Sequence, residues 1–211
     1  MGNILVHVGS QNGEAKRSSL EVLSHVSREI AGDSDQVIAC VFDTQTGQLE
    51  STLAQYGADK ALLYIDGAYA SHINEVLISG LQNAIEHSSP SLVVFASSES
   101  VKDILGAIAV KCGAVVLPDV VSFTFGDGSA EAVRPVMAAK TLARTKAAGD
   151  LIFISVRSGS VDAVKNPKSV DSEVVSAPTI PADVKLRLIE IVQAVGETVD
   201  LSEARVVVAA G

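Results

Sequence analysis

The fold of this chain is decided by Leu92-Val93-Val94-Phe95-Ala96, an apolar run that is followed by Ser97-Ser98-Glu99-Ser100. An uninterrupted apolar run of this length is typical of a strand that is buried on both faces. The hydroxyl groups after it suit the N-cap of a helix, and apolar positions then recur at helical spacing from Val101 to Cys112. A strand that leads directly into a helix is half of a β-α-β unit, so this stretch predicts a parallel sheet.

The same alternation of apolar strand and amphipathic helix runs back to the start of the chain. Strands are predicted at Ile4–Val8, Gln36–Phe42 and Lys60–Ile65, and helices at Leu20–Ile30, Leu49–Tyr56 and Ser71–His87. Parallel strands joined by right-handed crossovers form an open sheet with helices on both faces. We therefore expect an α/β, Rossmann-like fold with a mostly parallel open sheet flanked by helices.

After the helix that ends at Cys112 the pattern changes. Val115–Phe125 and Ala130–Val136 are extended runs joined by the turn residues Gly126-Asp127-Gly128, which predicts an antiparallel hairpin extension of the fold. The remaining predicted elements are a strand at Leu151–Val156, a polar surface loop at Ser158–Ser172, and either a strand or a helix at Val184–Val195.

Composition limits the class of protein. The chain has 211 residues, which suits one domain or one domain with an appendage, and its 47% hydrophobic and 19% charged residues exclude wholesale disorder. The formal net charge of −9 argues against the basic surface with which proteins bind nucleic acid. No apolar run is long enough to span a membrane and no signal segment is seen, so we expect a cytoplasmic protein that is not inserted in a membrane.

The residues that could carry chemistry form no recognisable catalytic or metal-binding set. Gly9–Gly13 follows the first strand, where phosphate loops lie, but it matches neither GxGxxG nor a P-loop, which favours a simple turn. Ser97–Ser100 lacks the G-x-S-x-G pattern of a serine nucleophile. Glu21, His25 and Glu29 share one helix face, which we interpret as a solvated stripe. We therefore predict no catalytic residue and no metal ligand.

At the end of the predicted hairpin this acidic chain has a basic cluster, which consists of Arg134, Lys140, Arg144 and Lys146. It is either a solvated face or the rim of a docking surface, and a specific interface usually has an apolar centre with a polar rim. Apolar hairpin residues that lie close to the cluster in sequence would supply such a centre. The predicted partner interface comprises Val120, Val121, Phe123, Phe125, Arg134, Lys140 and Arg144.

Over its whole length the chain resembles the N-terminal domain of the electron transfer flavoprotein alpha subunit. The stretches that carry the resemblance are Ile4–Val8 with Ser18, Leu20 and Glu21 after it, Tyr56–Lys60, Asp119-Val120, Arg134-Pro135 and, most specifically, Asp200–Val208. After the Arg-Pro pair the family usually has an aromatic residue and then Ala-Gly-Asn, whereas this chain has Met137-Ala138-Ala139-Lys140. No role is carried over from that family segment.

The resemblance implies an adenine-nucleotide-hydrolase-like fold for residues 1–195. It also implies that residues 196–211 are a linker and the first strand of an FAD-binding domain, so that the FAD site is expected beyond Gly211 and no FAD is expected on these residues. In that family a heterodimer of alpha and beta subunits carries electrons through FAD from dehydrogenases, as in fatty acid beta-oxidation, to an acceptor. This domain would then be a heterodimer scaffold within an electron carrier, not an enzyme.

Two other hypotheses stay open at this point. One is a stand-alone adenine-nucleotide-binding module whose ligand lies near Gly9–Gly13 and Ser97–Ser100, at the carboxyl edge of the sheet, where open α/β sheets bind ligands. The other is a small hydrolase that uses a serine or a histidine of the same loops, although no catalytic triad is recognisable.

Overall fold

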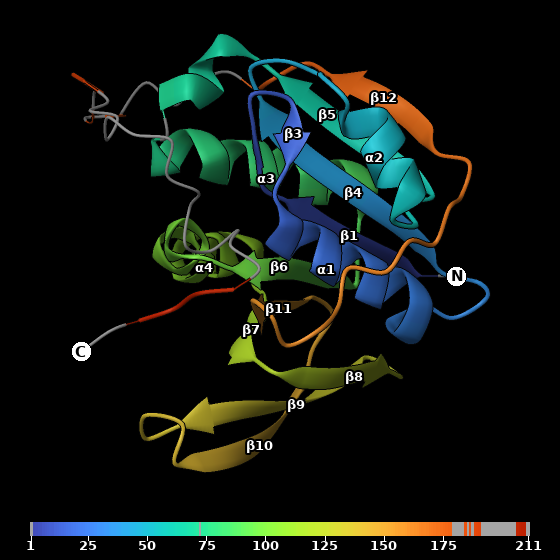
Figure 1. The fold of residues 1–211 in the computed structure, drawn as a ribbon, viewed down its shortest axis with the longest axis vertical. Coiled ribbons are helices and arrows are strands. Elements are labelled where there is room, and N and C mark those ends of the chain that lie inside the picture. The colour runs from blue at the N-terminus through green and yellow to red at the C-terminus, as the bar shows by residue number, and fades with distance from the viewer. Residues whose placement is uncertain are drawn as a thin grey trace.

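The structure, a computed structural model, describes residues 2–71, 73–178, 184, 186, 188–190 and 206–209. Its centre is a seven-stranded sheet with the strand order β12-β5-β4-β1-β6-β11-β7, in which every pairing is parallel (Figure 1). The strands are β1 (Asn3–Val8), β4 (Gln36–Asp43), β5 (Lys60–Ile65), β6 (Leu92–Ser97), β7 (Val115–Val120), β11 (Ile152–Arg157) and β12 (Asp171–Val175). The predicted α/β fold with a mostly parallel, helix-flanked sheet is confirmed.

Helices cover both faces of this sheet because successive side chains of each strand point in opposite directions. In β1, Ile4 and Val6 face one apolar core and Leu5 faces the other, and all three are fully buried. The first core lies under helix α1 (Arg17–His25), the π-helix η1 (Val26–Ile30) and helix α2 (Leu49–Gln55). The second core lies under helices α3 (Asn74–Ser88) and α4 (Glu99–Cys112).

Helix α4 begins where the hydroxyl-rich stretch predicts an N-cap. The Val101 N–H donates a hydrogen bond to Ser98 Oγ at 3.3 Å, which satisfies one of the unpaired donors of the first turn. The helix ends at Gly113, whose left-handed backbone (φ 66°) is the usual helix stop. The serine stretch is therefore a cap, as the sequence predicts.

The predicted extended run Val115–Phe125 is two strands that belong to different sheets. Its first half is β7, the edge strand of the large sheet, and its second half is β8 (Ser122–Gly126) of a separate antiparallel sheet. Before the break, Pro118 and Asp119 form a bulge, because these two residues lie opposite the single residue Ser155 of β11. Proline offers no N–H to a ladder and Asp119 has a left-handed backbone (φ 55°), so the pairing is interrupted here. It resumes only at Val120, opposite Val156, and the chain then turns away into β8.

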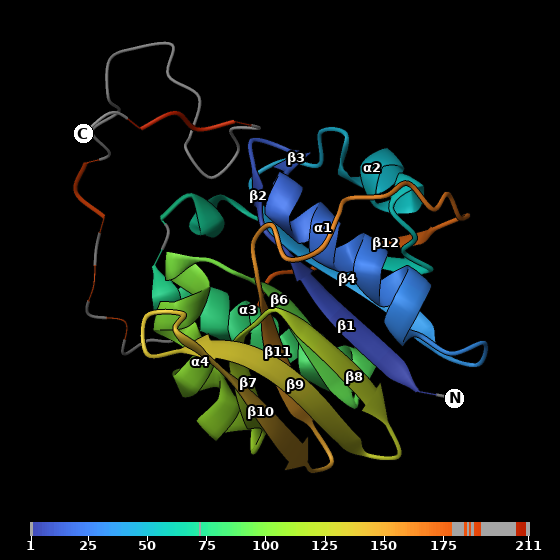
Figure 2. The same ribbon diagram turned by 60° about the horizontal axis from the view of Figure 1, so that its bottom comes forward.

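The antiparallel sheet has three strands rather than the predicted two. The turn Asp127-Gly128 joins β8 to β9 (Ser129–Val136), and β9 pairs in turn with β10 (Thr141–Ala148). We did not predict β10, because its lysine and arginine residues indicated a charged surface rather than a strand. Figure 2 shows this small sheet lying in front of β7 and β11, on the face that α1 covers elsewhere. The small sheet therefore covers this end of the large sheet, as the helices cover the other end.

A long loop carries the chain from β11 back across the helical face to the opposite edge of the sheet. The predicted surface loop is confirmed over residues 158–170, but Asp171–Val175 forms the edge strand β12, which we did not predict. The loop is fastened to the helices by side chains: the Val164 N–H donates to Ser24 Oγ at 3.2 Å, and Lys168 Nζ donates to Asp59 Oδ1 at 2.9 Å. These bonds fix the path of the chain over α1 and α2.

Much of the carboxyl-terminal part lies outside the described residues. Of the predicted element at Val184–Val195, only residues 184, 186 and 188–190 are described, and they have no regular secondary structure. Of residues 196–211, which we predict to be a linker and the first strand of another domain, only 206–209 are described, also without regular structure. Among the helices that the structure describes, none is long and apolar enough to cross a membrane.

Shortening the central strand should show that both cores stabilise the fold. Val93 and Val94 are fully buried on opposite faces of β6, so Val93→Ala and Val94→Ala should each lower the free energy of unfolding by roughly 1–3 kcal/mol. Urea denaturation measures this, with Val110→Ala, at an exposed position of α4, as the matched control. An unchanged midpoint for either buried variant would contradict the two-sided burial of β6.

Candidate functional site

The carboxyl ends of the parallel strands bring the polar residues of the sequence to one edge of the sheet. The first group is centred on Asp43, which ends β4 and is 6% exposed. Its Oδ2 accepts hydrogen bonds from Ser10 Oγ at 2.6 Å and from the Gly13 N–H at 3.1 Å. Its Oδ1 accepts from the N–H groups of Thr44 at 2.6 Å and Gln45 at 3.4 Å. One buried carboxylate thus holds two loops together.

The hydrogen-bond donors of the two loops form an anion-binding nest, and the carboxylate of Asp43 occupies it. Burial by itself raises the pKa of Asp43, but the hydrogen bonds from Ser10, Gly13 and the following turn outweigh it, and the pKa lies below its ordinary value. Asp43 is therefore charged at neutral pH and stands where a phosphate would be bound if the loop were a phosphate loop. The Gly9–Gly13 loop is a turn with a structural role.

Gly13 is required where these two loops meet. Its backbone is left-handed (φ 76°), and a Cβ at this position would lie 2.7 Å from the Cα of Gly47 in the neighbouring loop. No side chain fits a backbone-to-backbone approach of that kind. Gly13 is thus explained by close packing between the two loops.

The second group lies at the other end of the same edge and is centred on Asp119, in the bulge of β7. Arg157, the last residue of β11, donates from both Nε (3.2 Å to Oδ1) and a terminal guanidinium nitrogen to the two carboxylate oxygens. Ser97 Oγ also donates to Oδ1 at 3.2 Å, and the Asp119 N–H donates to Ser155 Oγ at 2.8 Å. Three strands, β6, β7 and β11, are joined through this one carboxylate.

The charges of this second group compensate each other within the chain. Hydrogen bonding by Arg157 lowers the pKa of Asp119, and Ser97 and the charge of Lys102 act in the same direction. A two-pronged arginine–carboxylate pair fixes geometry better than a single contact does. The predicted ligand-binding edge is therefore occupied, at both ends, by internal carboxylates whose partners come from the chain itself.

His7 and Cys40 lie in surroundings that do not favour catalysis. His7 is packed between the rings of Phe42 and Phe95, with centroids 5.9 and 5.7 Å away. Burial, and to a lesser degree the charge of Lys16, lowers the pKa of His7 to about 4, so its ring is neutral at pH 7. Burial raises the pKa of the Cys40 thiol, which disfavours the nucleophilic thiolate.

The helix face that carries Glu21, His25 and Glu29 is only in part the solvated stripe that we predicted, because Glu29 is exposed whereas Glu21 is buried. Glu21 is 8% exposed: it pairs with Arg17, and its Oε2 accepts a hydrogen bond from the Gly159 N–H at 3.1 Å. A residue that fastens the long loop to α1 has to be buried, and the helical spacing alone does not reveal this. No group of three potential metal ligands occurs in the part of the chain that the structure describes.

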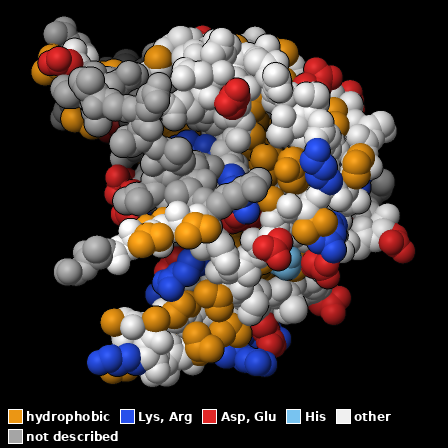
Figure 3. Space-filling view, viewed as in Figure 1, with side chains coloured by type: hydrophobic (Ala, Val, Ile, Leu, Met, Phe, Trp, Pro, Cys, Tyr) orange, Lys and Arg blue, Asp and Glu red, His pale blue; other side chains and the backbone are white. Residues whose placement is uncertain are grey.

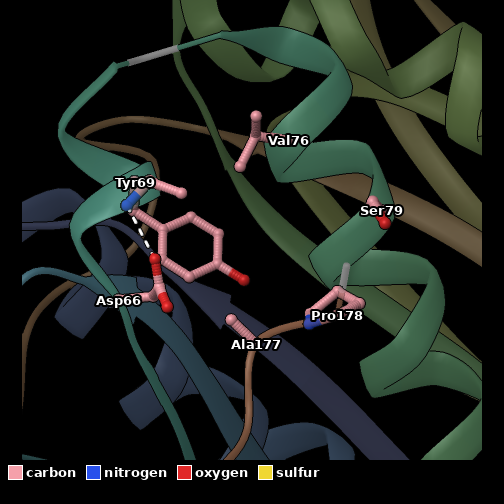
Figure 4. A pocket seen from close by; sticks show the side chains of 7 residues that line it. Asp66, Tyr69, Val76, Ser79, Ala177 and Pro178 are labelled. Atoms are coloured by element: carbon pink, nitrogen blue, oxygen red, sulfur yellow. Dashed lines mark hydrogen bonds between the residues drawn. The ribbon is translucent and has the colours of Figure 1, made fainter. Parts of the chain in front are cut away.

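A small pocket of about 260 Å³ lies beside the 3-10 helix η2 (Gly67–Ser71), between it and α3 (Figure 4). It is lined by Asp66, Ala68, Tyr69, Val76, Ser79, Ala177 and Pro178. Its size is just below the usual range for small-molecule sites, and none of these residues is a lysine or arginine. A phosphate-bearing cofactor such as FAD does not fit it, since Asp66 would repel the phosphates. We assign no flavin chemistry to the described residues.

The structure separates the residues of the predicted partner interface into two groups. Val120 and Phe123 are buried in the first core, and Phe125 and Val121 are half-buried, so these side chains cannot form the exposed apolar centre that we predicted. Phe123 and Phe125 point inward because β8 packs its apolar face onto the large sheet. Arg134 shares that inward direction with Ala132, two residues before it in β9, and its Nε is buried without a hydrogen-bond partner.

Lys140 and Arg144, by contrast, are exposed on the β9–β10 hairpin. Figure 3 shows apolar side chains gathered between lysine and arginine side chains over this part of the molecule. The exposed apolar residues are Leu142 in β10 and Met137 in the turn before it, which we did not predict. The alternation of small apolar and charged residues along Thr141–Ala148 was the signal that could have identified a strand with one exposed face.

Removing the Asp119 charge should weaken the fold in a pH-dependent way. Because the folded pKa is lowered, the charge stabilises the native state at pH values above the ordinary pKa of an aspartate, and the effect is lost as the pH falls through the folded value. Asp119→Asn keeps a residue that tolerates the left-handed backbone and should lower the free energy of unfolding by about 1 kcal/mol at pH 7, a figure that allows for partial exposure.

The difference in the free energy of unfolding between the parent chain and Asp119→Asn should shrink as the pH is lowered towards about pH 3, as measured by urea denaturation. Asp127→Asn, the same replacement at the exposed left-handed position of the β8–β9 turn, is the matched control and should change stability little. If Asp119→Asn lowered the free energy of unfolding equally at pH 7 and at about pH 3, the assigned ion pair would be contradicted.

Comparison with known proteins identifies the family. Residues 4–182 match the model of the electron transfer flavoprotein domain. The whole chain aligns with proteins named electron transfer flavoprotein subunit alpha, at 24% identity for that of Bacillus subtilis and 28% for that of Mycobacterium leprae. The corresponding protein of Syntrophomonas wolfei is 26% identical.

The chain spans about 65% of the length of these relatives. The alignment with each of them covers all of this chain, and the family match covers the large sheet, both helical layers and the antiparallel sheet. The chain therefore belongs to the electron transfer flavoprotein domain family.

Proposed function

We propose that this chain acts as the heterodimer scaffold of an electron transfer flavoprotein alpha subunit. In that role it holds a beta subunit in place while FAD passes electrons from dehydrogenases to an acceptor. The observation that carries the proposal is the alignment of the entire chain with relatives named as alpha subunits. Transfer of electrons is the work of the flavin, so the subunit is a carrier and not an enzyme.

The polar edge of the sheet supports a scaffold role. Where other open α/β sheets bind a ligand, this chain places the internal carboxylates of Asp43 and Asp119 and satisfies both with its own donors. Such groups rigidify the loops that they join, and they leave few free donors for a nucleotide. FAD would be held by residues outside the described part of the protein.

Complex formation with a beta subunit tests the proposal. The chain, mixed with the beta subunit from the same organism, should form a 1:1 complex in sedimentation and size-exclusion experiments. If the two proteins sediment independently at all accessible concentrations, the scaffold role is wrong. Tight binding of AMP by the chain alone would favour the stand-alone nucleotide-binding module instead.

The flavin content of the purified chain gives a separate prediction. Because the Gly9–Gly13 loop donates to Asp43 and the pocket beside η2 carries Asp66, the 211-residue chain should be colourless, without the flavin absorption bands. An absorbance spectrum after purification measures this, with the full-length alpha and beta complex as the reference. Near-stoichiometric flavin on the chain would contradict the assignment of FAD to other residues.

A further inference from the structure

The outward face of the β9–β10 hairpin is a surface that the described residues of the chain do not bury. In β9 the buried residues are Ala130 and Ala132, and in β10 the buried residue is Ala147, which pairs with Ala130. Residues that alternate with these point away from the large sheet. We call this set the hairpin face: Glu131, Val133, Pro135, Leu142, Arg144 and Lys146, with Met137 and Lys140 at its tip.

The composition of the hairpin face is that of an interface. Register places Leu142 opposite Pro135, and Arg144 opposite Val133, so that apolar and basic side chains are interleaved. Leu142 is 64% exposed and Met137 is 76% exposed, so one end of the hairpin presents two large apolar side chains to solvent. Arginine and methionine are enriched in protein interfaces, and charged groups commonly form their rim.

Charge sets the hairpin apart from the rest of the molecule. The chain carries a formal net charge of −9, yet residues 122–148 contain four lysine or arginine residues and only two carboxylates. One of these carboxylates, Glu131, is already paired with Lys146 at 3.7 Å. Lys140 and Arg144 have exposed side chains at the tip and in the middle of β10. The matching surface of a partner is therefore acidic.

The tip of the hairpin has an unusual backbone. Met137, Ala138 and Ala139 are all left-handed, with φ of 53°, 54° and 63°, and the turn is closed by the Lys140 N–H, which donates to the Met137 carbonyl at 3.2 Å. The other hairpin turn of the same sheet uses the favourable pair Asp127-Gly128. Consecutive left-handed non-glycine residues are strained and persist only where neighbouring groups hold them in place. Here all three residues are exposed.

We propose that the hairpin face is the docking surface for the beta subunit, and that the beta subunit meets it with an acidic surface that has an apolar recess for Met137 and Leu142. This inference rests on the proposed function. It explains why apolar side chains are exposed, why the local charge is reversed, and what holds the left-handed tip in place. A second copy of this chain fits less well, since a two-fold contact would set Arg144 against the same basic face.

Exposed side chains can be exchanged without loss of the fold, which makes the test direct. Leu142→Ser and Arg144→Glu should each weaken the binding of the beta subunit by about tenfold or more, as measured by titration calorimetry. The matched controls are Val110→Ser and Lys111→Glu on α4, which also replace an apolar by a hydroxyl side chain and a basic by an acidic one at exposed positions, and they should change the dissociation constant by less than about twofold. Circular dichroism and the urea midpoint confirm that each variant is folded.

A pair of variants tests the tip by itself. Ala139→Gly keeps the left-handed backbone accessible and should bind at least as tightly as the parent, whereas Ala139→Val disfavours that backbone and should bind more weakly. Equal affinities for the two variants would show that the tip conformation is not used in docking.

The outcomes separate this inference from the proposed function. If the parent chain binds the beta subunit and Leu142→Ser and Arg144→Glu bind equally well, the docking surface is wrong while the scaffold role stands. If the parent chain does not bind the beta subunit at all, the scaffold role fails and the docking surface with it. Self-association of the chain that is abolished by Leu142→Ser would assign the face to a second copy and overturn the proposal.

Discussion

The carboxylate of Asp119, held by Arg157 and Ser97, fixes the point at which the chain leaves the parallel sheet. Pro118 and Asp119 form a bulge opposite Ser155, and after one more pair, Val120 with Val156, the chain turns into the antiparallel sheet. The inner face of that small sheet then completes the first core. Its outer face carries apolar and basic side chains that are exposed in the part of the chain that the structure describes.

Most of the large sheet could be predicted from the sequence because its strands are buried on both faces. Uninterrupted apolar runs such as Leu92–Ala96 have no other plausible place in a protein of this size, and helical spacing between them fixes the connections. Besides the two-residue strands β2 (Ser10–Gln11) and β3 (Glu14–Ala15), we did not predict β10 and β12. Both lie at sheet edges, where alternate residues face water and charged side chains are common. Their patterns resemble those of solvated loops.

The candidate site was less accessible to sequence reasoning, because it depends on which side of a strand a residue occupies. Phe123 and Phe125 indicate an apolar centre, yet the register of β8 with β9 turns these rings toward the large sheet, and the register of β9 with β10 turns Leu142 outward. Similarly, Asp43 was not recognised as the residue that fills the Gly9–Gly13 loop. Those residues are 30 or more positions apart, and only the parallel pairing of β1 with β4 brings them together.

One face of the antiparallel sheet belongs to the core, and we propose that the other face binds a partner. Hydrogen–deuterium exchange of the chain with and without the beta subunit tests this claim most directly. The account predicts added protection in residues 133–146, while β6, which is already protected in the free chain, is unchanged. Added protection confined to the long loop of residues 158–170 or to β12, with none in the hairpin, would contradict it.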